Sequence, residues 1–213
     1  MILPLTGVGW AMLWLWTALA LAAPPETTER DVAEATRLSH EIERLAERNA
    51  WMGVERMFAD LLETGVAPGF DEWVAGAHAA RSRGDLAAAR TRLDMANRLQ
   101  EDRQVVEWLF DVDARFGRVW LACDKALDAT VVAHSPSFQP ESAAAVAFAA
   151  DRLSQDCSFD GLLPAGHYRF TWGSHEETFE VVPRVQSVRI DLRGMDPKLA
   201  RKSRRSEEPP PPP

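Results

Sequence analysis

The hydrophobic periodicity of this chain changes once, close to Gly117, and that change limits the fold more than any other feature. Before it, apolar residues recur at steps of three and four, the spacing of amphipathic helices. After it, apolar residues stand in short runs or alternate with polar residues between turn signals, the pattern of strands. The sequence therefore predicts an α+β protein: N-terminal helical hairpins over 27–116, then a small antiparallel β-sheet or sandwich with one inserted helix over 117–193.

The helical part carries recognisable boundary signals. Thr28 and Asp31 have the spacing of a capping box, and Asp71 and Asp85 are placed to cap two helices that Gly84 joins. Two helices of about 14 residues joined by so short a turn form a helical hairpin. Small residues fall where these two helices would have to approach closely: Ala77, Ala80, Ala89 and Ala96.

The same hairpin matches a known repeat. The matching residues are Trp73, Gly76, Ala77, Ala80, Gly84, Ala89, Leu93 and Ala96. At this spacing they resemble the tetratricopeptide repeat of about 34 residues, although Glu101 stands where that repeat usually has proline. Ala50–Gly65 looks like a degenerate neighbouring repeat, and 101–116 like a terminal capping helix.

The resemblance implies that one helix of each pair lines a surface that binds a partner protein or peptide. Carried over to this chain, that surface would present Asp71, Val74, His78, Arg81 and Ser82. Arg81 and His78 lie one helical turn apart and could clasp a carboxylate or a peptide terminus. The alternative is that this short helical region only packs against the strand-rich part.

The strand-rich part begins with two short predicted strands, Val119–Cys123 and Thr130–Ala133, followed by a helix over Glu141–Leu153. Three more short strands joined by tight turns follow. The turn sequence Leu163–Tyr168 (LPAGHY), followed by Phe179–Val181, resembles the β-sandwich domains called PEGA-like, in which such a turn precedes a strand. That resemblance implies an exported or envelope protein of bacteria.

Residues 1–23 carry no charged side chain, and 18 of them are hydrophobic. Ala20 and Ala22 stand at the small-residue positions of a secretory cleavage site, which predicts a signal peptide over 1–22. The alternative is an uncleaved anchor, because about 20 apolar residues span a bilayer. Either interpretation places the body outside the cytoplasm, in the periplasm or cell envelope.

An extracytoplasmic location changes the interpretation of the two cysteines, Cys123 and Cys157, which are 34 residues apart. In an oxidising compartment two such cysteines usually form a disulfide, so we expect this bridge. The alternative is a pair of separate buried thiols. A catalytic thiol is not expected, because no neighbouring base would lower its pKa.

Charge and motif content limit the function. Residues 24–193 hold 19 Lys and Arg against 29 Asp and Glu, a net charge of −10, which argues against a nucleic-acid partner. The five histidines are scattered, and no HExxH, GxSxG or Walker motif occurs. His167 and His175 flank a predicted hairpin and could approach each other, but no metal site, cofactor or catalytic set is expected.

Residues 194–213 form a basic, proline-rich tail that ends in Pro209–Pro213 and cannot build a core. We expect it to be disordered and to touch an anionic surface only weakly, which leaves the leader as the main membrane contact. The function predicted first is that of a non-catalytic adaptor binding a partner through its helical region. The alternatives are a structural subunit of an envelope assembly, docking through its β-domain or tail, and an unrecognised hydrolase.

Overall fold

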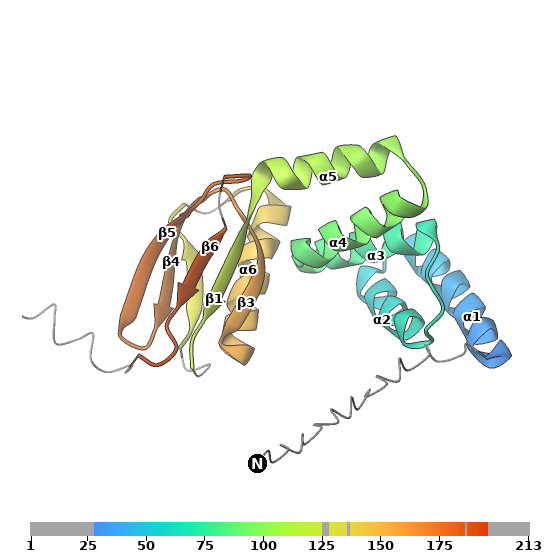
Figure 1. The fold of residues 1–213 in the computed structure, drawn as a ribbon, viewed down its shortest axis with the longest axis horizontal. Helices are drawn as coiled ribbons and strands as arrows, with labels where there is room; N and C mark the ends of the chain where they lie inside the picture. Colours follow the sequence, from blue (N-terminus) through green and yellow to red (C-terminus); the bar gives the residue numbers. More distant parts are fainter. Residues whose placement is uncertain (1–27, 125–127, 136, 186, 196–213) are drawn as a thin grey trace, which may run out of the picture.

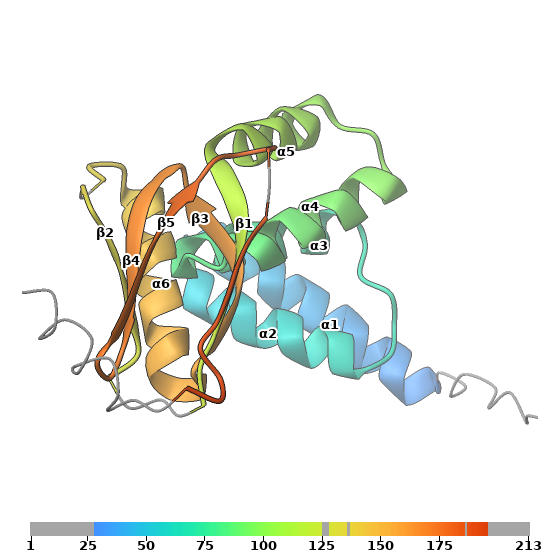
Figure 2. The same ribbon diagram turned by 60° about the vertical axis from the view of Figure 1, so that its left-hand side comes forward.

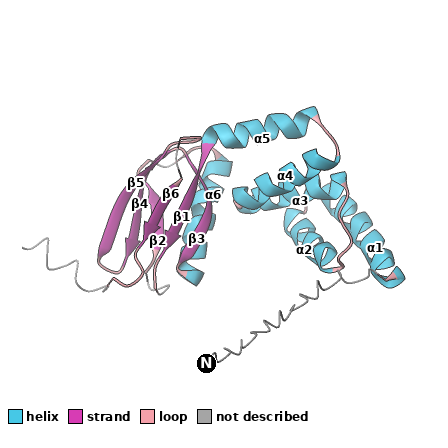
Figure 3. Cartoon of the chain, in the orientation of Figure 1, coloured by secondary structure: helices cyan, strands magenta, loops and turns pink. Residues whose placement is uncertain are grey.

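A computed structural model describes residues 28–124, 128–135, 137–185 and 187–195. The predicted leader and the predicted tail beyond Met195 lie outside these ranges. The α+β layout is confirmed: five helices lead into two three-stranded sheets, with a sixth helix inserted between strands (Figure 1, Figure 3). Within the described residues, no helix combines the length and apolar character needed to cross a bilayer.

The helices are α1 (Glu29–Ala46), α2 (Trp51–Glu63), α3 (Phe70–Arg83), α4 (Leu86–Leu99), α5 (Arg103–Arg115) and α6 (Pro140–Asp156). The strands are β1 (Phe116–Ala122), β2 (Thr130–Ala133), β3 (Ser158–Pro164), β4 (Gly166–Trp172), β5 (His175–Val181) and β6 (Val188–Asp191).

Two of the three predicted helix caps are confirmed. Thr28 and Asp31 form a capping box at α1, and the Asp85 carboxylate accepts a hydrogen bond of 3.0 Å from the backbone N–H of Ala88 in α4. The predicted cap at Asp71 is wrong, because α3 begins at Phe70 and its capping residue is Gly69, two residues before Asp71. Asp71 instead lies in the first turn, where its charge complements the helix dipole.

The helices approach each other through small residues, as predicted. The alanines of the α3–α4 hairpin are fully buried: Ala77, Ala80, Ala89 and Ala96. Gly76 has the same role toward α2, since a β-carbon there would lie 2.9 Å from the ring of Phe58. Phe58 can therefore fill the space between α2 and α3, and its side chain is one of the largest buried groups in the protein.

The two sheets have the strand orders β3-β1-β6 and β2-β4-β5, and they share one apolar core. Tyr168, Phe170 and Trp172 alternate along β4 and point into that core. Helix α6 packs against β2 and β3, one edge strand from each sheet, and so covers one side of the core (Figure 2). The sequence predicted antiparallel pairing throughout, and one pair differs. Strand β6 follows β5 in the chain and pairs with β1 in parallel.

Strand β3 was not predicted, because Gly161 and Pro164 within it are turn signals. It forms as an edge strand by pairing with β1 from Phe116 opposite Pro164 to Ala122 opposite Ser158. Proline is tolerated on an edge strand, where its missing N–H leaves no neighbour unpaired. The ring of Phe159 lies against Gly161, since a β-carbon there would meet that ring at 2.4 Å, so the glycine makes room for the aromatic side chain.

The predicted disulfide is confirmed: Cys123 and Cys157 are linked, with their Cα atoms 5.1 Å apart. The bond joins the end of β1 to the point where α6 turns into β3. The backbone N–H of Cys123 also donates to the carbonyl oxygen of Cys157 at 2.8 Å, which extends the β1–β3 pairing by one step. Both cysteines are buried, so the bridge belongs to the core of the strand-rich region.

The helical and strand-rich regions pack directly on each other. Gly84, between α3 and α4, lies so close to α6 that a β-carbon there would be 2.2 Å from the carbonyl oxygen of Ala144. Beside this contact lies an apolar cluster drawn from both regions: Leu86, Val112, Phe116 and Ala145. Helix α5 continues without a loop into β1, which links the regions a second time (Figure 1).

Candidate functional site

The inner face of α3, predicted to bind a partner, is largely covered by other helices. The ring of His78 lies between two indoles, stacked on Trp51 of α2 at 5.3 Å and tilted against Trp108 of α5 at 4.5 Å between ring centroids. This burial and the nearby Arg81 charge lower the pKa of His78, which favours the neutral ring. Val74 packs against the same part of α5.

Arg81 is paired with a carboxylate of its own chain. Its Nε lies 2.8 Å from Oε1 of Glu141, in the first turn of α6, and its guanidinium carbon lies 5.1 Å from the centre of the Trp108 ring. Glu141 also accepts a hydrogen bond of 2.6 Å from Arg115 at the end of α5. The Glu141 side chain is only 10% exposed, so this cluster fastens α3, α5 and α6 together.

The remaining two predicted residues stay at the surface. Asp71 is exposed in the first turn of α3, and the Ser82 hydroxyl donates to the carbonyl oxygen of Ala79 at 2.8 Å. The five predicted residues therefore do not meet in one open site. His78, Val74 and Arg81 contact neighbouring helices. Only Asp71 and Ser82, at the edges of this face, are exposed.

An open cleft lies instead between the helical and strand-rich regions. It has a volume of about 700 Å³, within the range of ligand pockets, and such pockets are common at domain interfaces. We call it the interdomain cleft. It is lined by Arg90, Phe110, Asp113, Phe116, Gly117, Arg118, Leu162, Arg184, Val185 and Ser187.

Two large apolar side chains of the interdomain cleft face solvent. Phe110 on α5 is 64% exposed, and Val185, between β5 and β6, is 74% exposed. Phe116 also lines the cleft and is buried, and Leu162 is half-buried. Because the exposed groups come from different regions of the chain, this apolar surface exists only when both regions are folded and packed.

Charged side chains surround this apolar surface. Arg90 and Asp113 form a two-point pair with nitrogen–oxygen distances of 2.6 and 3.0 Å, and Arg118 lies 3.0 Å from a carboxylate oxygen of Asp160. The hydrogen bonds from Arg90 lower the pKa of Asp113, and the charge of Arg184 adds to that effect. Arg90 and Arg118 therefore already have carboxylate partners.

Arg184 is held differently. It occupies the third position of a turn over Val182–Val185, after Pro183, with a φ of +62° that normally favours glycine. Its guanidinium donates to the backbone carbonyl oxygens of Phe110 and Asp113, each at 3.2 Å, near the C-terminal end of α5. It also lies 4.4 Å from the centre of the Phe110 ring. It forms no ion pair with any carboxylate that the structure describes.

Sequence reasoning did not find this cleft. Its lining residues are spread from position 90 to position 187, and no local motif connects them. One signal was present: on α5, Phe110 and Val106 are apolar but lie off the buried stripe that includes Val105 and Val112. An exposed phenylalanine one helical turn from an exposed valine marks a possible contact surface.

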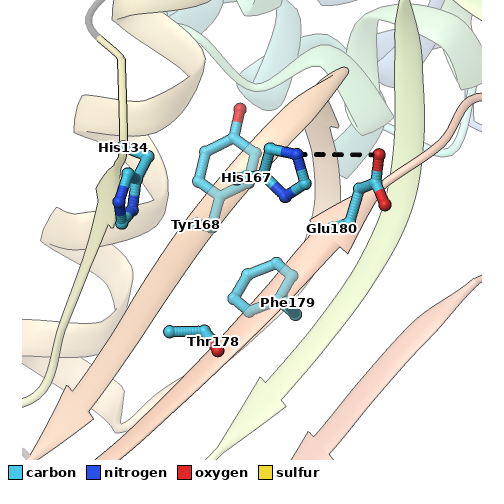
Figure 4. Close-up of a pocket in the computed structure, with 6 residues that line it drawn as sticks. All are labelled: His134, His167, Tyr168, Thr178, Phe179 and Glu180. Carbon is cyan, nitrogen blue, oxygen red and sulfur yellow. Dashed lines mark ion pairs between the residues drawn. The ribbon is translucent and has the colours of Figure 1, made fainter.

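A second hollow lies on the sheet β2-β4-β5, with a volume of about 450 Å³ (Figure 4). His167 faces Glu180 there, with Nε2 and Oε1 3.9 Å apart, and both side chains are exposed. The hypothesis that His167 and His175 approach each other is wrong, because His175 pairs with Trp172 at the opposite end of the β4–β5 hairpin. In the described part of the chain, no three His, Cys, Asp or Glu side chains are grouped to hold a metal ion.

Comparison with known proteins adds no relative to this picture: no family model, no curated protein sequence and no solved structure matches the chain.

Proposed function

We propose that this protein is an exported, non-catalytic adaptor of the bacterial periplasm or cell envelope that binds a partner protein. The observation that carries the proposal is the interdomain cleft, where exposed Phe110, from the helical region, and exposed Val185, from the strand-rich region, line one hollow. Exposed apolar residues gathered in a hollow between charged side chains are typical of surfaces that bind other proteins.

Two further observations support the proposal. The Cys123–Cys157 bridge is compatible with an oxidising compartment outside the cytoplasm. The order of the hairpins α1–α2 and α3–α4, followed by α5, supports a tetratricopeptide-like region, and the β4–β5 hairpin supports a PEGA-like one. The first resemblance implies a region that binds a partner protein or peptide, and the second implies an exported or envelope protein.

The structure favours the cleft over the inner face of α3 as the docking surface. On that face, Arg81 already pairs with Glu141 and His78 already stacks on two indoles. A partner would have to displace both sets of contacts, whereas Phe110 and Val185 are mostly exposed, although the Arg184 guanidinium lies against the Phe110 ring.

The test is affinity purification of the full chain from an envelope fraction, with quantitative mass spectrometry. We expect a protein that co-purifies with the wild type to be lost with Phe110→Ser and kept with Phe138→Ser. Phe138 is the matched control, because it is also a surface phenylalanine (98% exposed) but lies outside the cleft. The same set of proteins with all three baits would contradict docking in the cleft.

A further inference from the structure

We propose that the interdomain cleft recognises an acidic segment of the partner that also carries an aromatic or large aliphatic side chain. In this arrangement Arg184 pairs with the carboxylate, and Phe110 and Val185 contact the apolar side chain. The inference rests on the proposed function and adds to it the chemistry of the partner.

The first support is the sign of the charge in the cleft. Its lining holds three arginines against one aspartate, which leaves a charge of +1 when Asp160, the partner of Arg118, is included, whereas residues 24–193 carry a net charge of −10. A positive cleft on an acidic protein attracts an acidic segment there, while the rest of the surface repels it. Charge complementarity therefore both selects such a partner and orients it.

The second support is the position of Arg184 among the three arginines. Arg90 and Arg118 are paired with Asp113 and Asp160, while Arg184 forms no ion pair with a described carboxylate and contacts the carbonyl oxygens of α5 and the Phe110 ring. A guanidinium has five N–H donors, and the two hydrogen bonds to carbonyl oxygens use two of them, so three donors remain for a ligand. A carboxylate is the group that such a fork binds best, through two parallel hydrogen bonds.

The third support is the backbone at Arg184. A φ of +62° is unfavourable for a residue with a β-carbon, and glycine is the usual residue at this position of the turn. Arginine is less stable than glycine at this position, but its guanidinium is held against α5 at the edge of the cleft. The apolar part of the ligand follows from position, since Phe110 lies directly under that guanidinium and Val185 is the next residue.

The experiment uses a displayed library of random dodecapeptides, selected on the full chain. The selected peptides are then synthesised and titrated by fluorescence anisotropy. We expect Asp or Glu close to an aromatic or large aliphatic residue in the selected sequences. We expect Arg184→Gly to weaken binding by about tenfold and to reduce its dependence on salt.

Arg184→Gly should retain the folded protein, because glycine suits the φ of the turn, although the variant also removes the two hydrogen bonds from Arg184 to α5. Phe110→Ser should also weaken binding by about tenfold. The controls are Phe138→Ser and Arg103→Gln, which changes an exposed arginine of α5 outside the cleft; both should bind like the wild type.

The outcomes separate the two proposals. If Phe110→Ser weakens peptide binding but Arg184→Gly does not, the acidic preference is overturned and docking in the cleft stands. The same holds if the selected peptides lack acidic residues. If neither variant weakens peptide binding, or if no peptide is selected, both proposals are overturned. A dimer in sedimentation that Phe110→Ser converts to a monomer assigns the cleft to a second copy and overturns the partner proposed here.

Discussion

At the scale of single residues, Glu141 decides how the two regions are held together. Its carboxylate lies between Arg81 and Arg115 and is nine-tenths buried. Glu141→Ala would remove the carboxylate that Arg81 pairs with, while Arg115 would keep its second pair, at 2.7 Å, with Asp111. We expect a loss of about 2 kcal/mol in the free energy of unfolding, less than the roughly 3–5 kcal/mol of a broken buried pair, because both arginines partly reach water.

Urea denaturation of the full chain measures this loss. Glu141→Gln is the control, since it keeps the size of the side chain and one acceptor oxygen, and it should lose less than the alanine variant. A loss below about 0.5 kcal/mol for Glu141→Ala, the range of an ordinary surface substitution, would show that the cluster is not what holds α3 and α5 to α6.

His78 should make stability depend on pH. Its pKa in the folded protein is lowered, first by burial between two indoles and then by Arg81, so the unfolded chain binds the proton more readily. The stabilisation is therefore present above the unfolded pKa of about 6.5 and is lost as the pH falls through the folded pKa. We expect urea denaturation to show a smaller stability at pH 5 than at pH 7.

His78→Phe isolates this contribution, because it keeps an aromatic ring between Trp51 and Trp108 but cannot titrate. The difference in stability between pH 7 and pH 5 should be smaller in the variant than in the wild type. An equal difference in the two proteins would mean that other groups cause the pH dependence.

At the scale of elements, the contact between α6 and the turn joining α3 to α4 depends on one glycine. Gly84 has a φ of +85°, and a β-carbon there would overlap the backbone of Ala144. Gly84→Ala should therefore suffer both a conformational and a packing penalty, about 3 kcal/mol together.

Gly194→Ala is the matched control for Gly84→Ala. Gly194 also has a positive φ, +78°, but no atom of the described residues lies within 4 Å of its β-carbon position. It should suffer only the conformational penalty of about 1 kcal/mol. Chemical denaturation of both variants checks this, and equal losses would mean that the two regions do not pack closely at Gly84.

The disulfide acts on three elements at once, since it joins β1 to the end of α6 and the start of β3. A bridge that closes a loop of 34 residues should stabilise the fold by about 3–4 kcal/mol relative to the reduced chain. We expect the Cys123→Ser/Cys157→Ser variant to unfold at lower urea than the wild type. Reductant should shift the wild type toward the variant and leave the variant unchanged; equal midpoints for the two proteins would contradict a structural role.

Across the whole molecule, the sequence predicted local structure well and relations between distant segments poorly. The capping box at Thr28, the small residues of the α3–α4 hairpin and the cap at Asp85 depend on residues a few positions apart, and all were predicted. Strand β3 and the parallel pairing of β6 depend on partners far along the chain, and both were missed.

The same contrast between local and long-range structure applies to the candidate site. The face of α3 was predicted correctly as a row of residues on one helix, but its interpretation as an open surface required knowing that Trp108 and Glu141 pack onto it. The interdomain cleft draws on α4, α5, β1, β3 and the β5–β6 connection. Its residues come together only through tertiary packing, which no periodicity encodes.

The central claim is that the partner docks in the cleft and not on the inner face of α3. Site-specific photo-crosslinking in intact cells tests it most directly, with benzoylphenylalanine placed at position 110 in one full-length protein and at position 82, on the exposed edge of α3, in another. The account predicts a discrete adduct heavier than the chain from position 110 and none from position 82. An adduct from position 82 and none from position 110 would contradict it.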